Sequence, residues 1–460
     1  MLSTNEWVIE IKEKLRNMTE PYSVVSHDES EHWKKHSIYK IPDTFTDQNT
    51  NAYRPRAVSF GPYYNGEDQL KPMEEHKQRA LLHFLRRANK PPELFIECLE
   101  QVLQHLKDSY DPLDLCWHQD SDRFIQMMIL DGCFMLEIFR WSAYNLDDYA
   151  TNDPIFSDRG KIYMMPRIML DMLLLENQLP LLLLHKLISV QTNGQQKDEE
   201  DFVNRMILKF CFPCSRAVPN VGKCLHVLDV YRKALVQKHG KKHHHSRIRI
   251  HISGGGGGGG GGSDYISWCA RELSEGGISF KRSKTASLTD VSFHGRTLRL
   301  PELVVDDKTE SIFLNLMAFE RLHASAGNEM TSYIFFMASL IRSERDVAFL
   351  ESKGILQNDL GTQKAVAELF NSLGKYLAMD PDNNNLDLVQ INVSKSLHYA
   401  STKVNAYRKK AGKEFRVKVV GEYCRSPLAI LSLIAGIFFV TLTTAQTLYT
   451  ILPYYHRPSY

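Results

Sequence analysis

Apolar side chains recur along most of the chain with the spacing of amphipathic helices. In residues 93–108 they fall at three- and four-residue intervals, which places them on one face of a helix. Residues 310–323, 331–352 and 362–377 repeat this spacing, and Thr362 is of a type that commonly caps a helix N-terminus. These patterns predict a mainly α fold.

Two stretches depart from the amphipathic spacing. Residues 121–144 are apolar nearly all round a helix, which predicts a helix buried on every side in the core. Residues 38–66 carry prolines and glycines throughout, and these residue types favour turns and extended backbone. The expected body is therefore helical, with one irregular segment near its N-terminus.

An apolar run lies near the C-terminal end of the chain. Residues 427–452 contain no Asp, Glu, Lys, Arg or His, and about 20 such residues suffice to cross roughly 30 Å of hydrocarbon. Core helices rarely stay free of charge over this length. The run therefore predicts one transmembrane helix and a single-pass protein with a C-terminal membrane anchor.

The residues before this run carry a strong positive charge. Residues 401–425 hold eight Lys or Arg against two Glu, so the positive-inside rule predicts a cytosolic body, at the plasma membrane or an endomembrane. The same basic collar is expected to attract anionic lipid. Cys424 lies in it, three residues before the apolar run. It is a candidate for S-palmitoylation, the alternative being a simple interfacial thiol.

Nine consecutive glycines, at 254–262, follow a basic stretch rich in histidine. We interpret residues 238–264 as a flexible linker between two lobes. A nucleotide-binding glycine loop is disfavoured, because a homopolymer matches any glycine pattern and no ribose-binding acid is evident at the expected spacing. The predicted division is an N-terminal extension (1–37), an N-terminal helical lobe (38–237), the linker (238–264), a C-terminal helical lobe with the collar (265–425), the transmembrane helix (427–452) and a short tail (453–460).

Composition narrows the class of protein. With 460 residues, 43% of them hydrophobic and 24% charged, the chain is neither globally disordered nor a many-span membrane protein. Its eight cysteines are dispersed, which fits a reducing compartment better than a disulfide framework. The net charge of +2 and the lack of aromatics within the basic linker argue against nucleic-acid binding.

Several ordered strings resemble the plant "domain of unknown function 247" family, over roughly residues 38 to 452. Asp346-Val347 and Gly354-Ile355 also match its hallmarks, whereas the poly-Gly and His tract departs from the usual variable insert. The other matching strings are IYKIP (38–42), YRPRAVSFGPYY (53–64), LKPME (70–74), ILDGCF (129–134), LLENQLP (174–180), NLMAFE (315–320) and QTLY (446–449).

The resemblance implies a largely helical, single-span plant membrane protein without an established catalytic activity. Some grass members of the family are associated with pollen-side self-incompatibility. The resemblance therefore favours a role in recognition through a protein partner.

Cys211, Cys214, Cys224 and His226 form a C-x2-C-x9-C-x-H pattern. All four are zinc-competent, but a C-x-H second pair seldom wraps a tetrahedral ion. Structural thiols are the main interpretation, with a zinc site and a redox-active C-x-x-C pair as alternatives.

Polar residues interrupt two strongly apolar stretches. Buried carboxylates with a raised pKa can serve as general acids or bases. The commoner arrangement is an acid that holds a cation or a chain end, and polar side chains beside Pro180 would satisfy backbone groups freed by the proline. The expected structural polar core consists of Asp131, Glu137, Asp171, Glu176, Asn177 and Gln178.

A search for nucleophile-elbow, phosphate-loop, zinc-protease and kinase signatures finds none. The sequence therefore predicts a non-enzymatic interaction or recognition module without a cofactor. The alternative is an enzyme with an unrecognised carboxylate site in the helical core.

Overall fold

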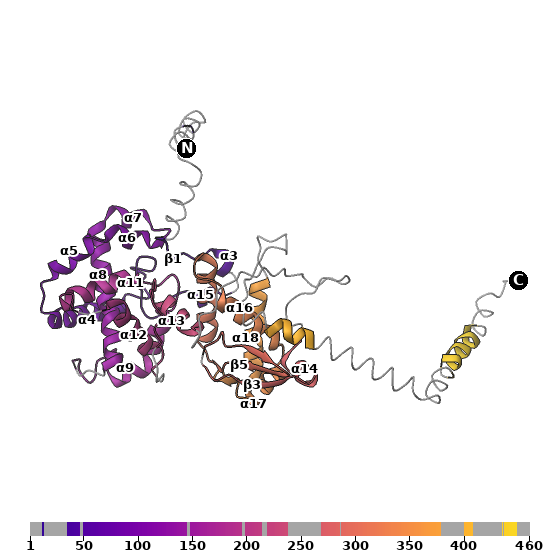
Figure 1. The fold of residues 1–460 in the computed structure, drawn as a ribbon. Helices are drawn as coiled ribbons and strands as arrows, with labels where there is room; N and C mark the ends of the chain where they lie inside the picture. Colours follow the sequence, from indigo (N-terminus) through magenta and orange to yellow (C-terminus); the bar gives the residue numbers. More distant parts are fainter. Residues whose placement is uncertain are drawn as a thin grey trace.

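The computed structural model shows two bodies side by side, an N-terminal lobe and a C-terminal lobe (Figure 1). Their buried apolar side chains form one cluster that runs through both lobes. The structure describes residues 12, 35–46, 49–144, 148–195, 198–213, 219–237, 268–285, 287–378, 400–407, 435 and 437–448. The predicted linker lies largely outside these residues, and the predicted domain boundaries stay predictions.

The N-terminal lobe is built around α8 (Ser121–Tyr144), which packs most extensively against four other helices. They are α4 (Pro72–Ala88), α5 (Pro92–Glu100), α11 (Leu181–Thr192) and α12 (Glu199–Cys211). Because neighbours surround α8, its nearly all-round apolar surface is buried, as predicted. The remaining elements are β1 (Ile38–Tyr39), α3 (Asp43–Thr46), the 3-10 helix η1 (Thr50–Ala52), α6 (Leu103–Asp108), β2 (Tyr110–Asp111), α7 (Leu115–Gln119), α9 (Asp158–Tyr163), α10 (Met165–Asp171) and α13 (Val227–Val236).

The C-terminal lobe packs helices against two small sheets. Strand β5 lies between a parallel neighbour, β3, and an antiparallel one, β4, while β6 pairs with β7 in parallel. The sequence interpretation did not include these strands. The elements are α14 (Ala270–Glu275), β3 (Ser279–Arg282), β4 (Ser292–His294), β5 (Thr297–Leu300), β6 (Leu303–Val305), α15 (Thr309–Leu322), α16 (Glu329–Leu340), α17 (Glu344–Ser352), β7 (Leu356–Asn358) and α18 (Gln363–Ala378).

Two predicted helices are each divided in the structure. The 93–108 stretch breaks between α5 and α6, and the 331–352 stretch breaks between α16 and α17. At the second break, the Ser343 N–H donates to Asp346 Oδ2 across 3.0 Å, which caps a new helix start. The predicted cap at Thr362 is confirmed, since its Oγ1 accepts from Ala365 N at 3.1 Å.

The C-terminal prediction is wrong. Among the residues that the structure describes, no helix is both long and apolar enough to cross a membrane. The transmembrane helix at 427–452, the single-pass C-terminal anchor, lipid anchoring through that helix and the cytosolic placement inferred from it are therefore not supported. Cys424 lies outside the described residues.

Candidate functional site

Asp171, at the end of α10, binds three successive backbone amides of another segment. Its Oδ2 accepts from Ala57 N at 2.7 Å and from Val58 N at 2.9 Å, and its Oδ1 accepts from Arg56 N at 3.0 Å. Burial raises the pKa of this carboxyl to about 6, although the three N–H donors oppose the rise. The carboxylate therefore holds residues 56–58, inside the irregular segment, in the way that a cap residue holds a helix N-terminus.

Asn177 binds the same irregular segment, and Gln178 binds the turn that carries Asn177. The Asn177 side chain accepts from Phe60 N at 2.7 Å and donates to Val58 O at 3.0 Å. Gln178 lies two residues before Pro180 and donates to the carbonyls of Met172 and Leu174 in the turn after α10. The Leu174 carbonyl also accepts from Asn177 N. Each amide side chain thus supplies hydrogen bonds to buried backbone groups.

Asp131, on α8, forms a fully buried ion pair. Lys77 Nζ, from α4, lies 2.6 Å from Asp131 Oδ1, and both side chains are at most 1% exposed. The other carboxylate oxygen accepts from Gly61 N at 2.8 Å. Burial raises the pKa of Asp131, and the Lys77 ammonium lowers it in part. The ion pair therefore ties α4, α8 and the irregular segment together.

Glu176 binds both ends of the same segment. Its Oε1 accepts from Ile41 N at 2.5 Å, and its Oε2 accepts from the hydroxyl of Tyr64. Burial raises the pKa of Glu176, while these two donors favour its ionised form. The carboxylate therefore fixes the separation between residues 41 and 64.

Glu137 does not belong to this cluster. It lies further along α8 and binds Arg87, Arg140 Nη2 at 3.3 Å and the hydroxyl of Tyr149 at 2.8 Å. Asp148 joins the same two arginines. The structure thus separates the predicted polar residues into two sites. Asp131, Asp171, Glu176 and Asn177 all bind residues 41–64, which we call the anchored segment, whereas the Gln178 side chain binds the turn after α10 and Leu228 N.

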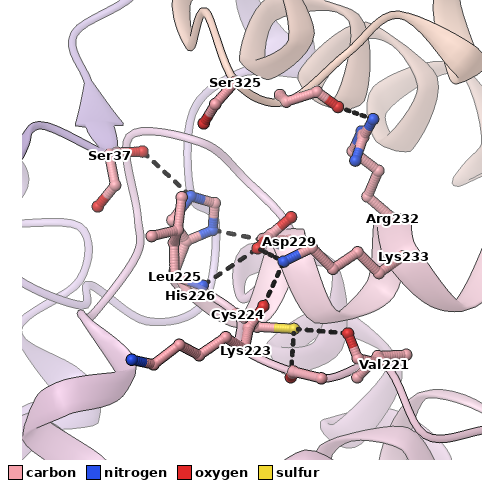
Figure 2. A network of polar contacts seen from close by, with 12 residues as sticks. Ser37, Val221, Lys223, Cys224, Leu225, His226, Asp229, Arg232, Lys233 and Ser325 are labelled. Carbon is pink, nitrogen blue, oxygen red and sulfur yellow. Dashed lines mark hydrogen bonds and ion pairs between the residues drawn. The ribbon is translucent and has the colours of Figure 1, made fainter. Parts of the chain in front are cut away.

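Two residues of the cysteine and histidine pattern, Cys224 and His226, lie in a network of polar contacts that Figure 2 shows. His226 is fully buried at the N-cap of α13, where Nδ1 accepts from Asp229 N at 3.3 Å and Nε2 lies 3.0 Å from Ser37 O. Because Nδ1 accepts, the proton is on Nε2, which donates to Ser37. Both ring nitrogens are therefore occupied, and burial lowers the pKa of His226 from 6.5 to about 4.

Cys211 and Cys224, the two thiols of this pattern that the structure describes, lie in settings that favour the neutral thiol. Burial raises the pKa of Cys211 and of Cys224 to about 12, which disfavours the thiolate that binds metal. Cys224 Sγ instead lies 3.4 Å from Gly222 O. Cys214 lies outside the described residues, and within the described part of the chain no three His, Cys, Asp or Glu residues are grouped to hold a metal ion.

Sequence reasoning missed a second buried ion network, which joins the two lobes. Arg232, on α13, donates from Nε to Glu320 Oε1 on α15 at 2.8 Å, and its Nη2 lies 2.6 Å from Glu329 Oε2. Glu320 also accepts from Met330 N and Thr331 N. The position of Glu320 within the apolar string NLMAFE could have indicated a buried acid, as the position of Asp131 within an apolar stretch did.

Asn315, from the same string, adds a second connection between the lobes. It is fully buried, its Oδ1 accepts from Leu175 N at 2.9 Å, and its Nδ2 donates to Ala52 O at 2.9 Å. One side chain of the C-terminal lobe therefore contacts both η1 and the turn that carries Glu176.

Comparison with known proteins now decides the family. Residues 38–442 match the family DUF247, described as a plant protein of unknown function. The chain belongs to this family. It is 30% identical over 438 residues to UPF0481 protein At3g47200 of Arabidopsis thaliana, covering 91% of this chain and 86% of that protein. It is 20% identical over 458 residues to Putative UPF0481 protein At3g02645 of the same plant, covering 80% and 82%. No solved structure matches.

In this DUF247 chain, the strings that carried the family resemblance contact one another. Backbone amides of the string at 53–64 donate hydrogen bonds to the strings at 129–134 and 174–180, through the side chains of Asp131 and Asn177. The string at 315–320 supplies Asn315 and Glu320. The sequence features of the family thus coincide with the polar contacts that hold the anchored segment and join the lobes.

Proposed function

We propose that this DUF247 protein is a non-enzymatic interaction module that binds a protein partner. The observation that carries the proposal is the complete internal use of its buried carboxylates. Asp131, Asp171 and Glu176 all bind backbone amides of the anchored segment. Their side chains are therefore positioned to hold this segment in one conformation.

An active-site role fits these carboxylates less well. Their exposed fractions are 0% for Asp131, 1% for Asp171 and 7% for Glu176, so a substrate in solution has little access to them. A raised pKa is typical of general acids, but here it follows from burial, which structural carboxylates share. A general acid or base must also reach the proton that it transfers.

The anchored segment presents two arginines to solvent. Arg54 and Arg56 are exposed, while the backbone at Arg56 is fixed by Asp171. Arginine is enriched at the energetic centres of protein interfaces. A backbone that is already ordered loses less conformational entropy on binding, which favours affinity. We therefore place Arg54 and Arg56 in the proposed interface.

Proximity labelling with the full chain, followed by titration of the purified candidates by calorimetry, tests this proposal. A saturable complex should form, and the joint substitution Arg54→Ala and Arg56→Ala should weaken it about tenfold or more, or roughly 1.4 kcal/mol. Arg86→Ala, an exposed arginine on α4, is the matched control and should leave affinity unchanged. Equal affinity for the double variant, or no enriched protein that binds the purified chain, would overturn the proposal.

A further inference from the structure

A small cavity lies where the two lobes meet beside α3. Its volume is about 60 Å³. The N-terminal lobe contributes residues around α3 and η1, and the C-terminal lobe contributes α15 and α18; Figure 1 shows α3 close to α15. The lining residues are Phe45, Asn49, Tyr53, Glu310, Leu314, Ser372, Leu373 and Tyr376.

The size of the cavity limits what it can hold. One water needs about 10–15 Å³ of such space, so roughly four to six heavy atoms fit. That is too small for a nucleotide or a sugar. It suits the end of one side chain or a short linear molecule.

The lining distinguishes an apolar part from a charged part. Leu314 and Leu373 are buried and supply aliphatic surface, and the rings of Phe45 and Tyr53 supply aromatic walls. Glu310 is the charged residue of the lining. Within the described part of the chain, its carboxylate forms no hydrogen bond or ion pair. Aromatic faces and a carboxylate both attract cations.

The polar rim of the cavity offers a hydrogen-bond donor to a ligand. The Tyr53 hydroxyl donates to the Tyr376 hydroxyl across 3.0 Å, which leaves the Tyr376 O–H proton free to donate elsewhere. Ser372 is exposed at this rim, on α18. A ligand can therefore enter from solvent at Ser372 with its stem between the leucines.

One nearby cation would repel a cationic ligand in this cavity. The Arg321 guanidinium lies 4.3 Å from the centre of the Phe45 ring, and Arg321 is not among the lining residues. It follows Glu310 by three turns of α15, about 16 Å along the helix axis. The Arg321 charge acts on two lining residues, Phe45 and Tyr376, so we place the cationic group of the ligand beside Glu310 instead.

We propose that this cavity binds a primary ammonium group on a short aliphatic stem. The stem lies against Leu314 and Leu373, and the ammonium reaches Glu310 with the aromatic rings beside it. A free alkylamine and a lysine side chain of a bound protein share this chemistry. The lysine alternative rests on the proposed interaction function, whereas a free amine would occupy the site without it.

The test uses the full chain and two pairs of probes, with binding measured by saturation-transfer NMR titration. The first pair is n-pentylamine and its neutral analogue 1-pentanol, and the second is N-acetyl-lysine methylamide and N-acetyl-norleucine methylamide. The cationic member of at least one pair should bind tenfold or more tightly than its neutral partner. Preference in the first pair alone indicates a free amine, and preference in the second indicates a side chain.

Three variants locate the binding. Glu310→Gln should weaken binding of the amines at least tenfold, and Ser372→Trp should abolish it by filling the cavity. Glu93→Gln is the matched control, because Glu93 is likewise the second residue of its helix but is exposed on α5 in the other lobe. Equal binding by Glu310→Gln and the control, with unchanged melting temperatures, or equal binding of amine and alcohol, would overturn the site.

Discussion

Arg232 and Glu320 form a buried ion pair across the boundary between the lobes, with Nε and Oε1 2.8 Å apart. Their side chains are 5% and 1% exposed. The Glu320 carboxylate also accepts hydrogen bonds from two backbone amides in the first turn of α16. This pair therefore couples the position of α13 in one lobe to the start of a helix in the other.

Breaking this pair should destabilise the whole chain. Arg232→Met leaves Glu320 buried without its cation, and such a loss typically costs about 3–5 kcal/mol. Chemical denaturation of the purified chain measures the change. Arg205→Met, which removes a half-exposed pair with Asp201 on α12, is the control and should cost no more than about 1 kcal/mol. Equal effects of the two substitutions would contradict the role assigned to Arg232.

Glu176→Ala should also lower the melting temperature and the cellular abundance of the protein. The substitution leaves Ile41 N and the Tyr64 hydroxyl without their acceptor, and each buried group left unpaired costs about 1–3 kcal/mol. Differential scanning fluorimetry gives the shift. Glu75→Ala, at an exposed position on α4, should leave the melting temperature nearly unchanged. A normal melting temperature for Glu176→Ala would argue against its structural role.

The sequence predicted local structure better than it predicted which side chains contact one another. The boundaries of α8 and the polar residue types of the core follow from apolar periodicity and from acids placed within it. Glu137 was grouped with Asp131 because both lie on α8, but their partners come from different segments. Arg232 and Glu320 are far apart in sequence, so no local pattern joins them.

Two glycines in the same turn region should respond differently to alanine. Gly61 and Gly66 have φ values of +76° and +88°, so each substitution carries a backbone cost of about 1–2 kcal/mol. At Gly61 a Cβ atom would also lie 2.8 Å from the hydroxyl of Tyr110, which is buried and bound to Gln178 O. At Gly66 nothing lies within 4 Å.

We therefore expect Gly61→Ala to be less stable than Gly66→Ala by about 1–3 kcal/mol in urea denaturation. The backbone cost is shared, so the difference reports the packing around Tyr110 and Gln178. Equal stabilities would show that the segment moves away from these residues without penalty.

The pH dependence of stability should report the burial of His226. Its pKa falls from 6.5 to about 4 on folding, so the stability that it contributes is complete above pH 6.5 and is lost as the pH falls toward 4. Over this range wild type should lose about 3 kcal/mol relative to His226→Gln, which does not titrate.

The comparison with His226→Gln isolates this histidine. Asp171, whose pKa is raised to about 6, contributes with the opposite sign, but it is present in both proteins and cancels in the difference. Asp229 favours protonation of His226 and His323 opposes it. Urea denaturation at half-unit steps of pH gives the two curves. A constant difference between them from pH 7 to pH 4.5 would contradict a buried neutral His226.

The most direct test of the central claim measures melting temperature and partner affinity on the same samples of Asp131→Asn, Asp171→Asn and Glu176→Gln. If these carboxylates hold the anchored segment and perform no chemistry, each variant should melt at a lower temperature and should bind the partner more weakly than wild type, without losing binding completely. The contradicting result is a variant with an unchanged melting temperature and a complete loss of function, because that combination marks an active-site carboxylate.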